Sequence, residues 1–193
     1  MSDQQITVII TTIGRPTLRR AIESCGDHPT IIVSDGKDVI VPVYRSSSLS
    51  YVRLGLRHGN YGCTAWNVGC GVAKTEYVTK LDDDDEFQDG ALDRMNDQVQ
   101  IDPSVDIWIP GLRYKDGREV CLREGLLEVG NVACPTIKTA IAAANPIRPQ
   151  SPLHLVDFNH IRNMVESGHK IRWYGFAAIA VRPNADGDYG RGN

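Results

Sequence analysis

The sequence predicts an α/β fold in which a mostly parallel sheet is flanked by helices. Apolar runs rich in β-branched residues alternate with amphipathic segments of helical length, as in repeated strand–helix–strand units. Polar and acidic residues follow several of the apolar runs, at the place where ligands of open parallel sheets bind. A chain of 193 residues, with 41% hydrophobic and 23% charged residues, also fits one ordinary globular domain.

The first quarter of the chain predicts a strand–helix–strand unit followed by a short strand. Residues 6–13 form an apolar, β-branched run, which predicts a buried strand. Pro16 is well placed at the start of a helix that continues amphipathically through residues 17–25. Residues 30–33 predict the second strand, and residues 39–44 predict a short third strand. At this spacing the strands are expected to be parallel.

The middle of the chain predicts two further helix–strand pairs. Residues 60–75 are rich in glycine and small side chains, but their apolar residues form a helical stripe. They lead into an apolar strand at residues 77–81. Residues 90–101 predict the next helix, and residues 105–109 predict the strand that follows it.

The character of the sequence then changes. Residues 113–120 predict a hairpin around an Asp-Gly turn. A helix is predicted at residues 135–144, and the prolines beyond it indicate an irregular link. An amphipathic helix over residues 153–167 and a strand over residues 170–181 are expected to complete the fold.

The composition excludes several classes of protein. The net charge of −3 provides no general attraction to nucleic acid or to an anionic membrane. Five cysteines, an odd number without C-x-x-C spacing, argue against a disulfide framework or a zinc site and for a reducing compartment. The sequence shows no secretory signal and no apolar segment of the roughly 18 residues that span a bilayer. We therefore expect a cytoplasmic protein without a transmembrane segment.

Five consecutive acidic residues, from Asp82 to Glu86, follow directly on the strand at residues 77–81. Alternate side chains of an extended segment share a face, so Asp82 and Asp84 are expected to point the same way. Clustered carboxylates repel one another unless water or a cation screens them. A solvated acidic turn is the simplest interpretation. The alternative is a divalent-cation site, because many α/β enzymes deliver carboxylates at the C-terminal end of a strand.

Two further polar segments lie where parallel strands are predicted to end. Asp35 could accept a hydrogen bond from a nucleobase or a ribose, or it could only form a turn with Gly36. Thr11, Thr12 and Gly14 would allow a ligand to approach the backbone closely. Ligands of open α/β sheets bind outside the carboxyl ends of the strands, so these segments and the acidic run are expected to form one site.

Taken in order, four segments resemble the family 2 glycosyltransferases, which have the GT-A fold. The family has an opening strand and helix, a strand that ends in Asp-Gly, the pattern N-x-G-x-x-x-A-x-N-x-G, and a metal strand of the form L-D-x-D-D. The corresponding segments here are VIITTIGRPTLRRAIES, IIVSDG, GNYGCTAWNVGCGVA and YVTKLDDDDEFQDGAL. The resemblance covers roughly residues 6–100, with Thr11 where the family often has proline.

The resemblance implies a nucleotide-sugar donor, most often a UDP-sugar, and a bound Mn²⁺ or Mg²⁺. Asp82 and Asp84 match the D-x-D positions of the family and Asp85 matches the acid that follows, so these three residues are the expected metal ligands. Asp83 stands at a position that the family leaves variable and is given no role. The residues expected to bind the donor are Thr11, Thr12, Gly14, Arg15, Asp35, Asn60, Gly62, Asn67 and Asp82.

Residues 154–171 resemble the acceptor-side helix of the family, in which a Glu-Asp pair precedes an amphipathic run and the Asp serves as catalytic base. Here Val156 precedes Asp157, so only the second acid is kept. Asp157 is the expected base of an inverting transfer. The alternative is a carboxylate favoured at a helix start by the macrodipole. Residues 130–133 stand where the acceptor loop of the family lies, and His169 comes too early to match the family's late histidine.

We therefore expect one GT-A domain that transfers a sugar from a nucleotide-sugar donor in a metal-dependent reaction. Residues 1–110 are expected to bind the donor, residues 111–183 to face the acceptor, and residues 184–193 to form a loose tail. The alternatives are a nucleotidyltransferase of similar fold and a non-catalytic relative that binds nucleotide sugars. The chain is short for the family, which is compatible with a soluble acceptor or with a homo-oligomer that completes the site.

Overall fold

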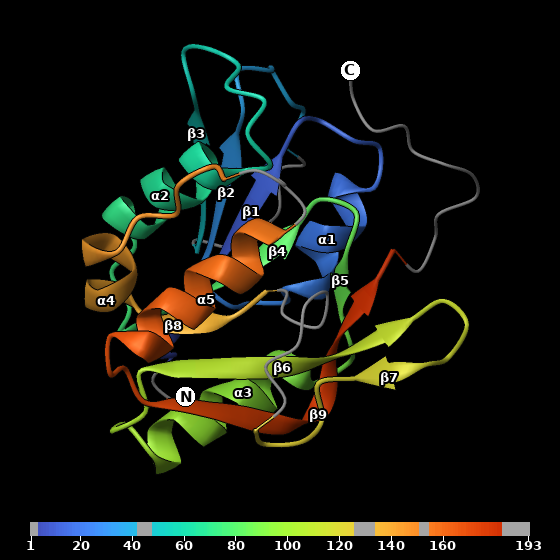
Figure 1. Ribbon diagram of the computed structural model, residues 1–193. Helices are drawn as coiled ribbons and strands as arrows, with labels where there is room; N and C mark the ends of the chain where they lie inside the picture. The colour runs from blue at the N-terminus through green and yellow to red at the C-terminus, as the bar shows by residue number, and fades with distance from the viewer. Residues whose placement is uncertain (1–3, 42–47, 126–133, 151–154, 183–193) are drawn as a thin grey trace.

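A single mixed sheet forms the centre of the molecule, with helices on both of its faces (Figure 1). The structure, a computed structural model, describes residues 4–41, 48–125, 134–150 and 155–182. The strands are β1 (Ile6–Thr12), β2 (Thr30–Ser34), β3 (Leu49–Arg53), β4 (Tyr77–Asp82), β5 (Glu86–Phe87), β6 (Ile107–Tyr114), β7 (Glu119–Val120), β8 (Thr136–Lys138) and β9 (Ile171–Val181). The helices are α1 (Leu18–Ser24), α2 (Cys63–Val72), α3 (Ala91–Ile101), α4 (Thr139–Ala144) and α5 (Val156–Glu166).

The strands lie in the order β3-β2-β1-β4-β8-β6-β9-β5, and β7 pairs with β6. The first four strands of this order are parallel to one another. The register places Thr11 of β1 beside Asp82 of β4, and Thr12 of β1 beside Ser34 of β2. The carboxyl ends of β1, β2 and β4 therefore meet at one end of the sheet.

Side chains of β1 alternate between two hydrophobic cores on opposite faces of the sheet. Val8 and Ile10 pack in a first core with helices α1 and α3, whereas Ile9 packs in a second core with α2, α4 and α5. Because alternate side chains of a strand point to opposite faces, a strand that is apolar throughout needs helices on both sides. All five cysteines are buried free thiols within these two cores.

The rest of the sheet is mixed in direction. β8 is antiparallel to both β4 and β6, whereas β6 and β9 run parallel to each other. The predicted hairpin is confirmed, since Arg113 of β6 pairs with Glu119 of β7. Its turn contains Gly117, whose φ of 82° is the left-handed conformation that this turn requires. The predicted fold class, a mostly parallel sheet flanked by helices, is confirmed.

The third predicted strand, at residues 39–44, is wrong in its described part. Residues 39–41 form no strand, because Val39 and Val41 pack against the first core instead, and residues 42–44 lie outside the described residues. The strand that pairs with β2 is β3. It lies at the edge of the sheet and its side chains are half-buried or exposed, so no continuous apolar run revealed it.

The predicted helix at residues 135–144 is wrong in its first part, which forms β8, and only the second part forms α4. Thr136 and Ile137 are fully buried between β4 and β6, where an extended segment completes the backbone hydrogen bonds of both neighbours. The expected acceptor loop at residues 130–133 and the expected loose tail at residues 184–193 lie outside the described residues.

Most of the remaining predicted helices and strands match the structure with small differences at their ends. The helix predicted at residues 153–167 corresponds to α5, and its first two predicted residues lie outside the described part. Beyond the end of α5, Gly168 has a φ of 92°, which is the left-handed conformation that glycine commonly adopts after a helix. Of the helices that the structure describes, none combines the length and the apolar character needed to cross a bilayer.

Candidate active site

Polar residues from three strands gather at the carboxyl ends of β1, β2 and β4. The Thr11 hydroxyl donates a hydrogen bond to Oδ1 of Asp82 over 3.0 Å, which ties β1 to the first acidic residue. Asp35 follows β2 at the same end, and its backbone N–H donates to the carbonyl of Thr12 over 2.9 Å. The structure thus brings together the three segments that the sequence placed at strand ends.

The acidic run turns after Asp82. The Asp85 N–H donates to the Asp82 carbonyl over 3.1 Å, and β5 begins directly afterwards. The expectation of an extended segment is therefore wrong beyond Asp82, because the chain turns there to pair β5 with β9. Asp82 and Asp84 are nevertheless both partly exposed. Asp83 and Asp85 are buried.

Asp83 has a structural role that the sequence did not reveal. Its carboxylate is fully buried and accepts a hydrogen bond from the Thr12 hydroxyl at 2.6 Å. The backbone N–H groups of Ile13 and Arg15 point to the same oxygen at 3.2 and 3.3 Å. The Arg15 guanidinium pairs with the other oxygen. These contacts fix the loop between β1 and α1 against the end of β4.

The rest of the acidic run carries more negative charge than the nearby arginines neutralise. Asp84 lies 3.3 Å from Nε of Arg182 and 3.9 Å from the Arg15 guanidinium. Burial nevertheless raises the pKa of Asp84, and Arg15 opposes this effect only in part. Burial, together with Asp82 and Asp84, raises the pKa of Asp85 to about 8, although the Arg182 N–H donates to this carboxylate. An additional cation at this place would relieve the repulsion.

The carboxylates suit a hard divalent cation that a substrate helps to hold. Among the residues that the structure describes, no three His, Cys, Asp or Glu side chains converge on one point as a metal site. Asp82 and Asp84 offer carboxylate oxygens on the exposed side of the run. Mg²⁺ prefers oxygen ligands and usually keeps waters and substrate phosphates in its shell. The residues present therefore fit a cation shared with a diphosphate better than one held by the protein alone.

Lys80 of β4 joins the acidic run to Asp157 of α5. Its Nζ lies 3.4 Å from Oδ1 of Asp82 and 3.2 Å from Oδ2 of Asp157. The Lys80 side chain is 5% exposed, whereas the Asp157 side chain is 26% exposed. Burial by itself lowers the pKa of Lys80, but Asp157 and Asp82 outweigh it and hold this pKa well above its ordinary value. Lys80 thus bridges the predicted base, Asp157, and the first residue of the acidic run, Asp82. This role of Lys80 was not predicted from the sequence.

Asp35 has both oxygens engaged by the segment that follows β3. The backbone N–H groups of His58 and Gly59 donate to its two oxygens over 2.8 and 2.9 Å, and the His58 ring lies 3.2 Å away. Burial raises the pKa of Asp35, but these hydrogen bonds outweigh it and leave the pKa below its ordinary value. Asp35 therefore holds a loop at the strand ends, and its contact with a nucleotide remains a prediction.

The three residues predicted to bind the donor at and just before α2 also have structural roles. The side-chain oxygen of Asn60 accepts a hydrogen bond from the Thr64 N–H at 3.3 Å, which ties the segment before α2 to the first turn of the helix. A Cβ atom at Gly62 would lie 2.9 Å from the Thr11 hydroxyl oxygen, so glycine allows α2 to approach the end of β1. Asn67 exchanges two hydrogen bonds of 2.9 Å with the backbone of Ile147. Their contacts with a donor remain predictions.

His169 lies far from the acidic run. Its Nδ1 is 3.6 Å from a carboxylate oxygen of Asp106, next to the start of β9. Arg182, at the other end of β9, is the residue that reaches the acidic run. That His169 comes too early to match the family's late histidine therefore remains a prediction.

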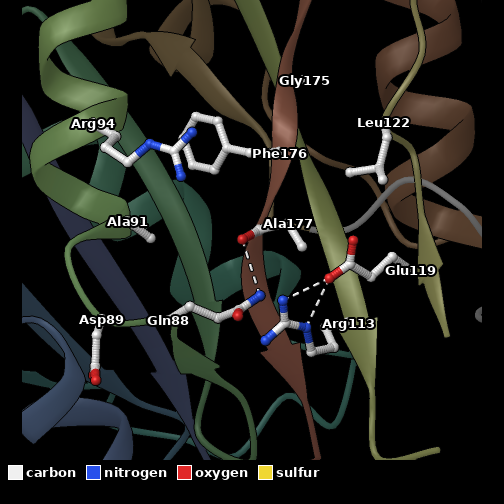
Figure 2. Close-up of a pocket in the computed structure, with 10 residues that line it drawn as sticks. All are labelled: Gln88, Asp89, Ala91, Arg94, Arg113, Glu119, Leu122, Gly175, Phe176 and Ala177. Carbon is white, nitrogen blue, oxygen red and sulfur yellow. Dashed lines mark hydrogen bonds and ion pairs between the residues drawn. The ribbon is translucent and has the colours of Figure 1, made fainter. Parts of the chain in front are cut away.

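A separate cleft of about 310 Å³ lies between the start of α3 and strands β6, β7 and β9 (Figure 2). Three pairs of groups line much of it: Arg113 with Glu119 at 2.6 Å, Gln88 with the carbonyl of Ala177 at 2.9 Å, and Arg94 at 3.7 Å from the ring centre of Phe176. Each of these groups thus interacts with its partner in the wall of the cleft. No residue of the acidic run lines the cleft. The cleft is therefore not part of the candidate active site.

Comparison with known proteins places this geometry in a known fold. A model of glycosyl transferase family 2 matches residues 7–123, which contain β1 to β7 and the acidic run. No curated protein sequence matches the chain.

Three solved structures show the same arrangement of strands and helices. TarS from S. aureus, residues 1–349, is similar with a TM-score of 0.69 at 15% identity, over 92% of this chain and 60% of that chain. The same fragment in complex with UDP-GlcNAc is similar with a TM-score of 0.62 at 14% identity, over 92% and 58%. The mannosyltransferase PcManGT from Pyrobaculum calidifontis, in complex with GDP-Man and Mn²⁺, gives 0.71 at 15% identity, over 95% and 58%.

At these identities the likeness establishes the fold, and the expected GT-A fold is confirmed. The chain spans about 60% of the length of the TarS fragment.

Proposed function

Because the chain belongs to glycosyl transferase family 2, we propose that it transfers a sugar from a nucleotide-diphosphate sugar to an acceptor hydroxyl. One observation carries this proposal. The partly exposed Asp82 and Asp84 stand at the carboxyl end of a central parallel strand, within the segment that the family model matches. Ligands of open α/β sheets bind at this end. Two structures of the same fold, with UDP-GlcNAc and with GDP-Man, support a nucleotide-sugar donor.

The proposed donor is a UDP-sugar that lies across the ends of β1, β2 and β4. Thr11, Thr12 and Gly14 would lie against the nucleotide, and Arg15 would lie near its phosphates. Asp35 would accept a hydrogen bond from the nucleobase or the ribose. A carboxylate has about four acceptor positions, so Asp35 can do this while it keeps its bonds to the loop after β3.

Asp82 and Asp84, with the buried Asp85 behind them, are the proposed ligands of Mn²⁺ or Mg²⁺. When bound there, the cation would neutralise charge on the departing nucleoside diphosphate. Arg15 and Arg182 already stand beside Asp84 and add positive charge to the same place. Burial, and after it the neighbouring carboxylates, raise the pKa of Asp84 and Asp85, and a bound cation would offset this cost, which supports the assignment.

Asp157 is the proposed base of an inverting transfer. Its carboxylate contacts the buried Lys80 but is partly exposed, so an oxygen remains accessible to an acceptor hydroxyl. Asp157 would take up the proton of that hydroxyl while the hydroxyl oxygen attacks the anomeric carbon of the donor sugar. Its ion pair with Lys80, which also contacts Asp82, supports this role over that of a helix-start charge alone.

The connection between β1 and α1 argues against a nucleotidyltransferase. Such enzymes usually carry a glycine-rich loop with Arg and Lys soon after the first strand. Here only residues 13–17 separate β1 from α1. The buried Asp83 carboxylate holds this loop through hydrogen bonds from the backbone N–H groups of Ile13 and Arg15. A loop so short and so constrained leaves little room to wrap a triphosphate.

The test uses the purified chain with a panel of UDP- and GDP-sugars, with and without Mn²⁺. We expect at least one of them to raise the melting temperature only when the cation is present, because ligand binding to the native state stabilises it. The same compound should release its nucleoside diphosphate. A non-catalytic relative would be stabilised without cleaving any donor, and a nucleotidyltransferase would release pyrophosphate from UTP and a sugar phosphate. A chain that binds no nucleotide sugar would contradict the proposal.

A further inference from the structure

We propose that Lys80 is a positioning residue, which holds the Asp157 carboxylate at the donor site by sharing its ammonium group between Asp157 and Asp82. This inference rests on the proposed function and adds to it a residue that the family resemblance did not single out. Lys80 follows three neutral residues of β4 and stands two residues before Asp82, at a place where its charge is almost completely removed from solvent.

The packing of α5 does not by itself fix the direction of the Asp157 side chain. The helix is attached to the sheet through Val156, Ile161 and Met164, which are apolar residues of the second core. These contacts set the position of the helix axis but leave a carboxylate in the first turn free to rotate. Both carboxylate oxygens of Asp157 instead lie within 3.4 Å of the Lys80 Nζ. The ion pair with Lys80 is therefore the contact that orients the Asp157 carboxylate.

Because Lys80 is buried, loss of either carboxylate partner would be costly. An ammonium group that is removed from water is costly unless carboxylates and hydrogen bonds compensate it. Lys80 has two such partners, and Thr11 donates to the same oxygen of Asp82 that Lys80 approaches. Any movement of Asp157 away from Lys80 would leave a buried charge with one partner only. The structure thus opposes displacement of Asp157.

Lys80 also lies between two carboxylates that would otherwise repel each other. Asp82 and Asp157 both lie within ion-pair distance of the same nitrogen, so they are close neighbours. Replacement of Lys80 by a neutral residue should turn Asp157 away from the acidic run. It should also leave Asp82 more available to a divalent cation, because Lys80 and the cation compete for the same carboxylate. Turnover and cation-dependent nucleotide binding are therefore expected to change in opposite directions.

The experiment compares Lys80→Met with Lys80→Arg and with a matched control, Lys138→Met. Lys138 also lies on a strand of the sheet and pairs with an aspartate, Asp106, but it stands beside Tyr77 at the opposite end of β4. Binding of UDP with Mn²⁺ is measured by calorimetry. Turnover is measured as UDP or GDP release from the nucleotide sugar that the wild type cleaves.

We expect Lys80→Met to lower kcat on the order of 10- to 100-fold while the Kd for UDP with Mn²⁺ stays unchanged or falls. Lys80→Arg should recover part of the turnover, and Lys138→Met should retain wild-type values of both. In the Asp157→Asn background, Lys80→Met should cause no further loss, because residues that act through one another are not additive. Wild-type kcat in Lys80→Met, or additive losses in the double variant, would overturn the proposal.

A readout that needs no activity separates this inference from the proposed function. If the wild type cleaves no nucleotide sugar, the proposed function fails, and a crystal structure of Lys80→Met decides the positioning role. A displaced Asp157 carboxylate would support that role, and an unmoved one would overturn it. If Lys80→Met does not fold, the structure of Lys80→Arg is determined instead: a guanidinium that keeps the Asp157 carboxylate paired beside the acidic run would support the positioning role, and a carboxylate that keeps its place without contacting the guanidinium would overturn it.

Discussion

The two halves of the sheet contribute to the site in different ways. β3, β2, β1 and β4 are parallel neighbours that follow one another closely in the sequence, and their carboxyl ends present Thr11, Asp35 and Asp82 together. β8, β6 and β9 pair in mixed directions across long stretches of chain. This second half delivers Asp157 on α5 and Arg182 at the end of β9. The proposed donor site is thus formed by neighbouring parallel strands, whereas the groups proposed to act on the donor come from α5 and the end of β9, in the mixed half.

The sharpest test of this division of roles is Asp157→Asn. The amide keeps the size of the side chain but cannot take up a proton, so we expect turnover to fall roughly 100- to 10,000-fold. Donor binding should persist, because the ends of the parallel strands are untouched. Steady-state release of the nucleoside diphosphate and calorimetry with UDP and Mn²⁺ measure the two quantities. Wild-type turnover would remove Asp157 from the mechanism and break the comparison.

Asp84→Asn makes the reciprocal change in the parallel half. It removes one charge from the proposed cation ligands, and we expect the cation-dependent affinity for UDP to fall by about 100-fold or more. The matched control is Asp116→Asn, an exposed aspartate in the turn of the β6–β7 hairpin, whose carboxylate accepts a hydrogen bond from the Arg118 N–H at 3.0 Å that an asparagine oxygen can also accept. Calorimetry with Mn²⁺ should separate the two variants. Equal affinity in Asp84→Asn and the control would count against the metal assignment.

The parallel half also depends on the close approach of α2 to β1. A Cβ at Gly69 would lie 2.4 Å from Cγ2 of Ile9, a fully buried residue, whereas a Cβ at Gly71 would meet nothing within 4 Å. We expect Gly69→Ala to lower the free energy of unfolding by about 1–3 kcal/mol through overpacking. Gly71→Ala on the same helix should be neutral or should stabilise by up to about 1 kcal/mol. Urea denaturation of both variants measures the difference, and equal stabilities would show that the helix can shift freely.

The smallest expected effect concerns α5 and the pH dependence of stability. Burial, with a smaller contribution from Lys80, lowers the pKa of His160 to about 4, and its buried Nε2 has no hydrogen-bond partner among the residues that the structure describes. The unfolded chain has a histidine pKa of about 6.5, so it binds this proton first as pH falls. The contribution of His160 to stability should therefore decrease from about pH 6.5 towards pH 4, whereas Asp85, whose pKa is raised to about 8, acts in the opposite sense. His160→Phe should therefore gain stability relative to wild type as the pH falls over this range in thermal melts, and a constant difference between the two curves would contradict the assignment.

The sequence revealed most of the parallel half because its strands are buried on both faces. β1 and β2 stand out as runs rich in β-branched residues, β4 as a short run that leads into the acidic residues, and each strand ends in a polar residue at the candidate site. β3 and β8 were missed for opposite reasons. β3 is an edge strand with exposed side chains, and β8 is only three residues long and defined by pairing with β4 and β6. Pairing with distant strands is not visible in a local pattern.

For the candidate site, the sequence predicted the positions of those residues that lie at the ends of parallel strands. The acidic run and Asp35 lie where the parallel order predicts them, and Asp157 lies beside the run. The roles of Asp83 and Lys80 could not be predicted, because both depend on contacts with residues far away in the sequence. A lysine in the middle of a buried strand was the available signal for Lys80, since such a charge needs a partner.

The burial of all five free cysteines has a practical consequence for studying this protein. The five cysteines are at most 7% exposed in the folded state, and burial raises the pKa of Cys25 to about 12. A thiol-reactive dye should therefore label the chain only during transient opening of its two cores. The labelling rate would then measure how often each core opens. Because the cysteines lie in the cores on both faces of the sheet, both faces can be followed without an introduced probe.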